Sequence, residues 1–236
     1  MSWWVFVLIG LGVLAVLIAI ANFAPAQFRR TFRKYNKIQS SLGITADQFA
    51  VAAVQASPYE TLSLARIKGD LTDAYIPKQN VIALSETTIG NKSVAAIAVV
   101  AHEYGHAIQK NSNSTFFNVT HYFAIITAFL SKLAIPSIVV GLILKFFVEN
   151  KEALGMGLIY AGIVVIIIAF LHKLFTIPVE YDATNRGLKY LAEYEVLNAK
   201  ELRIAKKVLR AAGLTYVASF LATMLSWTFL VPKYKG

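Results

Sequence analysis

Four apolar stretches of membrane-spanning length constrain this chain more than any other feature. They cover residues 3–23, 122–148, 154–177 and 214–231. At about 1.5 Å of rise per residue, roughly 20 helical residues cross the ~30 Å hydrocarbon core of a bilayer. Hydrophobic residues make up 57% of the chain and charged residues only 15%, which is too apolar for an ordinary soluble domain. The sequence therefore predicts a mainly α, polytopic membrane protein with about four transmembrane helices.

The basic residues indicate how such a protein is oriented. The formal charge is +10, but the cations flank the apolar stretches, so we expect the lipid bilayer and not nucleic acid as the partner. Most of them follow the first stretch or separate the third from the fourth. By the positive-inside rule, segments 25–118 and 178–213 are expected in the cytoplasm. The chain begins with an uncharged Met-Ser-Trp-Trp, unlike a cleavable signal, so we expect a multi-pass protein of a bacterial plasma membrane.

The first cytoplasmic segment is the only polar stretch long enough to form a lobe outside the membrane. Residues 70–76 and 81–84 flank a Pro-Lys-Gln-Asn turn at 77–80, which predicts a β-hairpin. Ser93 is a plausible N-cap for a following helix over 94–110. We expect the lobe and the spans to form one integrated domain over residues 1–236.

The second cytoplasmic segment is helical by pattern, with a break near Asn198. Pro178 suits the first turn of a helix. Along that helix, Glu180, Ala183 and Gly187 share one face. Glu180 is thus predicted near a helix start, on the same side of the membrane as the helix over 94–110.

The predicted helix over 94–110 carries His102-Glu103-Tyr104-Gly105-His106, an H-E-x-x-H motif. Side chains four residues apart share a helix face, so both imidazoles can reach one metal ion, with the glutamate beside a metal-bound water. Zinc fits best, because it accepts imidazole and carboxylate and lowers the pKa of bound water to about 7. An accidental spacing is the alternative, but the apolar run before His102 predicts burial, where unpaired histidines would be costly.

A third metal ligand must come from elsewhere in the chain. Cysteine is absent, and Ser112 stands where a metzincin has its third histidine. His121 and His172 lie beside or inside apolar spans, and we interpret both as structural or interfacial. Glu180 is the better candidate, although an acidic residue in a first helical turn is also favoured by the helix dipole alone.

The sequence resembles the YugP-type membrane zinc metallopeptidases, which are more distantly similar to the HtpX-type and CAAX prenyl proteases. The resemblance covers most of the chain. The extended motif around His102 is its most specific part. The matching stretches are Gly69–Tyr75, Leu84–Ser85, Ser93–Gln109 and Pro178–Arg186.

The resemblance implies a gluzincin-like site in which Glu180 completes the shell of a single zinc ion. The HtpX-like relatives support this site with an Asp four residues after the ligand glutamate, where this chain has Thr184. The nearest acid, Asp182, is predicted on another helix face. Ala74 and Ile76 also depart from the family pattern, in which His and Asp are often found.

These features predict a zinc metalloendopeptidase that cleaves membrane proteins or peptides at the cytoplasmic face, with Glu103 as general base. Arg186 or Tyr190 is a candidate oxyanion donor, although either can equally be a surface or packing residue. The strand Val81, Ile82, Ala83 and Leu84 is a candidate for binding an extended substrate by strand addition, or a purely structural strand. The alternatives are a non-catalytic zinc-binding scaffold or adaptor and a metal transporter.

Overall fold

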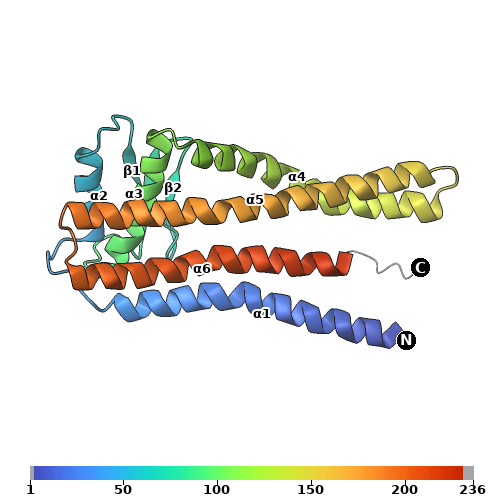
Figure 1. Ribbon diagram of the computed structural model, residues 1–236, viewed down its shortest axis with the longest axis horizontal. Coiled ribbons are helices and arrows are strands. Elements are labelled where there is room, and N and C mark those ends of the chain that lie inside the picture. The colour runs from blue at the N-terminus through green and yellow to red at the C-terminus, as the bar shows by residue number, and fades with distance from the viewer. Residues whose placement is uncertain (1–2, 231–236) are drawn as a thin grey trace. The chain divides into compact units, whose positions relative to one another are not determined.

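The chain is mainly helical, with one small sheet. The computed structural model describes residues 3–230. The two units are Met1–Ser114 with Ile177–Gly236, and Thr115–Thr176. The expected mainly α class is confirmed. The single integrated domain expected over residues 1–236 stays a prediction. The elements in chain order are α1 (Trp3–Tyr35), α2 (Ala46–Gln55), β1 (Ser63–Ile67), β2 (Ala74–Ile76), β3 (Val81–Ser85), α3 (Val94–Asn111), α4 (Thr115–Phe147), α5 (Glu152–Glu193) and α6 (Ala199–Leu230) (Figure 1).

The predicted hairpin is present as β2 and β3, which pair in an antiparallel way across the turn at 77–80. Its first strand begins at Ala74 and not at residue 70, because Asp73 bonds to the end of β3 instead. The Asp73 carboxylate accepts hydrogen bonds from the Ser85 backbone N–H at 2.8 Å and the Ser85 hydroxyl at 2.6 Å. β1 is not predicted from the sequence. It pairs with β3 in parallel, so that β3 is the central strand in the order β1-β3-β2.

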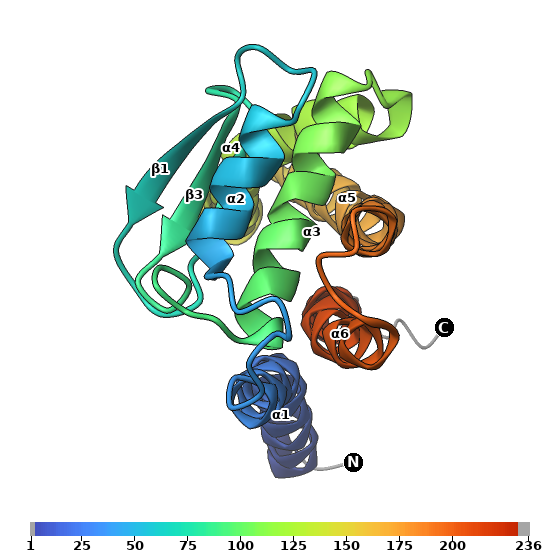
Figure 2. The same cartoon turned by 90° about the vertical axis from the view of Figure 1, so that its left-hand side faces the viewer.

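α3 is the central helix of the larger unit. All eight residues from Val94 to Ala101 are buried. Its predicted N-cap is confirmed, because the Ser93 hydroxyl accepts a hydrogen bond from the Ala96 N–H at 3.1 Å. Figure 2 shows the sheet and α2 on one side of α3 and α6 on the other. A helix with this many buried small side chains can be approached closely by its neighbours.

α5 corrects the predicted helix start at Pro178. The helix runs unbroken from Glu152 to Glu193 with Pro178 inside it. Proline lacks the backbone N–H and removes one helical hydrogen bond, but long apolar helices tolerate this loss. The sequence pattern alone does not show whether a proline starts a helix or lies inside one. Glu180 therefore lies deep inside a long helix and not in a first turn.

The predicted break near Asn198 is confirmed. Asn198 caps α6, because its side-chain oxygen accepts hydrogen bonds from the N–H groups of Lys200 and Glu201. The Glu201 carboxylate in turn accepts from the Asn198 N–H at 2.9 Å. Such a reciprocal pair satisfies the free N–H groups at a helix start. α6 then packs along α1 in the opposite direction (Figures 1 and 2).

The second unit contains α4 and the first part of α5. A Cβ atom at Gly141 would lie 2.6 Å from the Gly155 carbonyl oxygen, so the two helix backbones touch at these glycines. Among the described residues, α4 and α5 are the two helices that are long and apolar enough to cross a membrane. The side chain of Lys132 is exposed on α4. The four-span arrangement stays a prediction, and Val231, the end of the fourth predicted span, lies outside the described residues.

Candidate metal centre

The site forms where α5 crosses α3 at small residues. A Cβ atom at Gly105 would overlap the backbone carbonyl of Ala183, and one at Gly187 would overlap that of Ala101. Ala183 itself is completely buried. Only glycine permits such close backbone contact. The crossing carries Glu180, which lies one turn before Ala183, up to the two histidines of α3.

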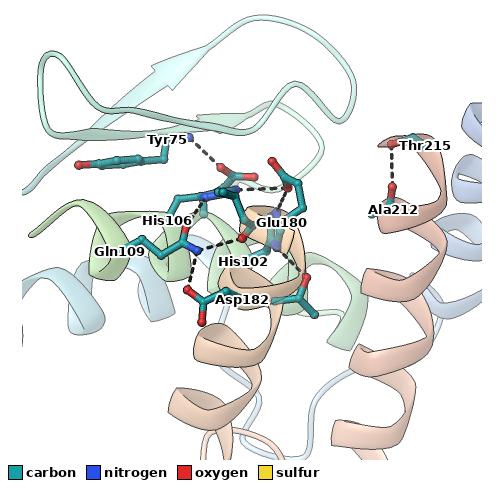
Figure 3. Close-up of polar contacts among 11 residues, drawn as sticks. Tyr75, His102, His106, Gln109, Glu180, Asp182, Ala212 and Thr215 are labelled. Atoms are coloured by element: carbon teal, nitrogen blue, oxygen red, sulfur yellow. Dashed lines mark hydrogen bonds and ion pairs between the residues drawn. The ribbon is translucent and has the colours of Figure 1, made fainter. Parts of the chain in front are cut away.

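His102, His106 and Glu180 converge on one point, as Figure 3 shows. The Nε2 atom of His102 lies 3.1 Å from Oε2 of Glu180, and the Nε2 atom of His106 lies 3.4 Å from the same oxygen. The ligand atoms of all three lie within 4.8 Å of one another. The structure thus brings together the three side chains that the sequence singled out.

These separations fit a tetrahedral zinc ion. Two ligand atoms that each lie about 2.1 Å from such an ion are about 3.4 Å apart. The distances of 3.1 and 3.4 Å to the Glu180 oxygen are close to that value. Two imidazoles and one carboxylate, without a thiolate, form a donor set that zinc accepts. The residues therefore could hold a metal ion with little movement.

The other ring nitrogens of the histidines have their own partners. Nδ1 of His106 lies 2.9 Å from the Gln109 amide oxygen, and Nδ1 of His102 lies 3.1 Å from the Thr184 hydroxyl. Because an amide oxygen only accepts, His106 carries its proton on Nδ1 and leaves Nε2 available for a metal. Thr184 thus contacts the first histidine of the motif.

Gln109 holds its orientation through two further contacts. Its amide nitrogen donates to the Val179 carbonyl at 2.9 Å and to the Asp182 carboxylate at 2.7 Å. Both partners are acceptors, so the amide cannot be turned around without losing both bonds. Asp182 also accepts from Arg186 at 2.7 Å. Asp182 therefore supports His106 through Gln109, although it lies on a different face of α5 from Glu180.

Glu103 is buried, with 9% of its surface exposed, and is held at the edge of the sheet. Its Oε2 accepts a hydrogen bond from the backbone N–H of Tyr75 in β2 at 2.7 Å (Figure 3). Burial raises the pKa of Glu103, against the opposing charges of His102 and His106 and the bond from Tyr75. A carboxylate with a raised pKa is a better proton acceptor near neutral pH.

The remaining charges at the site are strongly coupled. Burial alone would raise the pKa of Glu180, but hydrogen bonds from the two histidines and their charges outweigh it and lower the pKa to about 2. Burial likewise opposes protonation of His106, while its bond to Glu180 and the charge of that carboxylate raise the pKa to about 9. Without metal, the site therefore holds a proton beside the carboxylate, and a dication would displace that proton.

Two predicted oxyanion donors, Tyr190 and Arg186, are held by other partners. Tyr190 packs in an aromatic cluster, with its ring 4.7 Å from that of Tyr104 and 4.3 Å from that of Tyr194. Arg186 pairs with Asp182. In the second unit, His121 stacks on Phe117, and Nε2 of His172 lies 3.3 Å from the Thr120 carbonyl.

The substrate strand predicted at Val81–Leu84 is wrong as placed. β3 is paired with β1 over all four residues and with β2 over Val81–Ala83. A paired strand has no free N–H and C=O groups for strand addition. Within the described sheet the outer edge of β2 is the one that contacts Glu103, through Tyr75.

Three contacts at the site were not expected from the sequence. In the sequence, Gln109 is only the last residue of a stretch that matches the family, and the Tyr75 backbone carries no side-chain signal at all. The third is Tyr216 of α6, whose side chain lies near the carboxylates of Glu180 and Glu103. The one sequence signal for these contacts is that Gln109 follows His106 by three residues, which places both side chains on the same helix face.

Replacing Gln109 by Leu is expected to weaken zinc binding by about 10- to 100-fold, the usual effect of losing a partner of a ligating histidine. The change removes the acceptor of the His106 Nδ1 proton and leaves the Val179 carbonyl without its bond. Titration of zinc against a competing chromogenic chelator measures the effect. Asn111→Ala is the control, because that amide bonds to Asn80 and the Ala107 carbonyl. Equal affinities in both variants contradict the role of Gln109.

Comparison with known proteins finds a matching peptidase family and a relative. The family described as "Putative neutral zinc metallopeptidase" matches residues 9–232. A relative from Bacillus subtilis (strain 168), "Putative membrane protease YugP", is 28% identical over 207 residues, which cover 88% of each chain. No solved structure matches the chain significantly.

Proposed function

Because the chain belongs to the neutral zinc metallopeptidase family, we propose that it is a zinc-dependent endopeptidase of a bacterial plasma membrane. His102, His106 and Glu180 hold one zinc ion, and Glu103 is the general base. The observation that carries this proposal is the convergence of two Nε2 atoms on one Glu180 oxygen, beside a buried carboxylate that is not part of the ligand group.

Each residue of the site has a separate task in peptide hydrolysis. Zinc, when bound, polarises the scissile carbonyl and makes water acidic enough to be activated near neutral pH. Glu103 takes the proton from the attacking water and delivers it to the leaving amine. The Tyr75 N–H holds one oxygen of Glu103 and thereby aims the other. Gln109 and Thr184 keep the imidazoles in place.

Tyr216 is the best placed oxyanion donor. Its side chain lies near the carboxylates of both Glu180 and Glu103, on the side of the ligands where an oxygen would develop charge. Arg186 and Tyr190, the donors considered from the sequence, are engaged with Asp182 and with an aromatic cluster. Hydroxyl donors of this kind stabilise the tetrahedral oxyanion during acyl transfer.

Replacing Tyr216 by Phe is expected to lower kcat by about 10²- to 10³-fold, because one oxyanion donor is lost. Zinc content and KM change little, since the hydroxyl is no ligand. Steady-state hydrolysis of a fluorogenic peptide, with zinc measured on the same samples, checks this expectation. Tyr190→Phe is the matched control, and a larger loss there than at Tyr216 refutes the assignment.

The substrate is proposed to bind beside β2. The outer edge of this strand contacts Glu103, and extended peptides add to exposed edges through backbone hydrogen bonds. The basic segments 25–118 and 178–213 favour a cytoplasmic site at the membrane surface. Membrane proteins and peptides at that surface are therefore the proposed substrate class.

Removal of zinc tests the function directly. The full chain, purified in detergent, is expected to contain one zinc per molecule and to cleave an unstructured protein such as casein. Treatment with 1,10-phenanthroline should abolish cleavage, and added zinc should restore it, because the ion polarises the carbonyl. A protein that keeps its zinc but cleaves neither casein nor a diverse peptide library supports a structural zinc and a scaffold. Zinc uptake into vesicles supports a transporter.

A further inference from the structure

A basic cavity lies between α1 and α6, apart from the metal centre. Its volume is about 720 Å³, within the range of about 300–1,000 Å³ typical of small-molecule sites. Four cations line it: Arg30 and Lys34 from α1, and Lys207 and Arg210 from α6. The other lining residues are Gln27, Thr31, Tyr35, Ala211 and Leu214.

The helical spacing brings the four cations to one place. Arg30 and Lys34 are four residues apart, and Lys207 and Arg210 are three apart, so each pair shares a helix face. The two helices pack against each other in opposite directions, which brings the two faces together. All four side chains are exposed.

The charges in this cavity lack partners of opposite sign. No acidic residue lines it. Over residues 3–230, none of the four cations belongs to an ion pair; the pairs found join Glu180 to its histidines and Asp182 to Arg186. Like charges around one cavity repel each other, so the cavity favours an anion.

The position of the cavity along the helices indicates what kind of anion fits. On α1 the apolar run 3–23 ends one turn before Gln27, and on α6 the run 214–231 begins at Leu214, which itself lines the cavity. Since the helices are antiparallel, both apolar runs leave the cavity on the same side. The cavity therefore has a basic part next to an apolar part, as expected at the headgroup level of a bilayer.

We propose that this cavity binds the phosphate headgroup of an anionic glycerophospholipid. The Arg and Lys side chains contact the phosphate, and the Gln27 amide and the Tyr35 hydroxyl contact the remaining polar groups. The acyl chains extend past Leu214 along the apolar sequence runs that follow the cavity. A soluble phosphate or an acidic peptide would gain nothing from that apolar side. The proposal depends on α1 and α6 being embedded in the membrane, and not on the peptidase activity.

Lipid binding to the full-length protein tests the proposal. The protein is purified in a zwitterionic detergent, and phosphatidylglycerol or phosphatidylcholine is titrated while native mass spectrometry counts the bound lipid. The cavity variant carries Arg30→Gln, Lys34→Gln, Lys207→Gln and Arg210→Gln. The matched control removes the same charge from exposed residues of the same two helices that do not line the cavity, with Arg29→Gln, Arg33→Gln, Arg203→Gln and Lys206→Gln.

The wild-type protein and the control are expected to bind phosphatidylglycerol at least tenfold more tightly than phosphatidylcholine, and the cavity variant is expected to lose this preference. Equal losses in both variants overturn the proposal, because they indicate general attraction to a basic surface. Full competition by millimolar inorganic phosphate, or tighter cavity-dependent binding of an acidic peptide, also overturns it. Circular dichroism and zinc content verify folding. The double variant Lys207→Gln with Arg210→Gln decides the matter if the fourfold variant does not fold.

Discussion

Replacing Glu103 by Gln is expected to lower kcat for peptide hydrolysis by about 10²- to 10⁴-fold, the usual contribution of a general base. Zinc content should stay at the wild-type level. Glutamine has nearly the same shape, and its side-chain oxygen can still accept the hydrogen bond from the Tyr75 N–H. What it loses is the ability to take a proton from water. Activity is thus removed without removing the metal.

This combination separates the peptidase from a protein with a structural zinc. The measurement is cleavage of a fluorogenic peptide, with zinc determined by mass spectrometry on the same samples. Glu193→Gln is the matched control, because Glu193 lies exposed near the end of α5 and should behave as wild type. If the Glu103 variant cleaves at the wild-type rate, Glu103 is not the base. If it loses zinc along with activity, Glu103 belongs to the ligand shell.

Replacing Glu180 by Gln is expected to abolish stable zinc binding, with a loss on the order of 10³-fold or more, since partners of ligands alone contribute 10- to 100-fold. The variant loses the one negative ligand that lies within 3.4 Å of both histidines. An amide oxygen donates weakly to zinc and leaves the dication without compensating charge. Equilibrium titration against a chelator measures the affinity.

The same titration tests the other candidates for a third ligand. His121→Asn and His172→Asn are expected to keep full affinity, because these rings contact Phe117 and the Thr120 carbonyl in the second unit. Asp182→Asn should weaken binding only about 10-fold, through Gln109. If Glu180→Gln binds zinc normally while one of these three changes abolishes binding, the ligand set is different from the one proposed.

Much of the local structure could be predicted because it depends on neighbours in the chain. The helix over 94–110 was predicted within one residue of α3, with its Ser93 cap. The turn at 77–80 and the break at Asn198 were also predicted, since turn and cap residues act over a few positions. The placement of a helix start at Pro178 failed for the same reason. Proline occurs both in the first turn of helices and inside long apolar helices, and the neighbouring residues do not show which of the two positions Pro178 occupies.

The parts of the site that were missed come from contacts between distant segments. The pairing of β1 with β3 removed the predicted substrate strand, and no pattern within residues 81–84 reports which edges of a strand are occupied. The side chain of Tyr216 in α6 lies near Glu180, and the backbone N–H of Tyr75 in β2 bonds to Glu103. A backbone N–H is present at almost every position, so the sequence cannot indicate which one bonds to Glu103.

By itself, the sequence determined that His102 and His106 lie on one helix face with Glu103 next to them in the chain. Residues four apart meet on the same face of a helix whatever the rest of the chain does. Only the tertiary structure decided that Glu180 meets them. The crossing of α3 and α5, with Gly105 against Ala183 and Gly187 against Ala101, brings the carboxylate to the histidines. The close packing of two backbones is a property of both helices together, and neither sequence segment contains it alone.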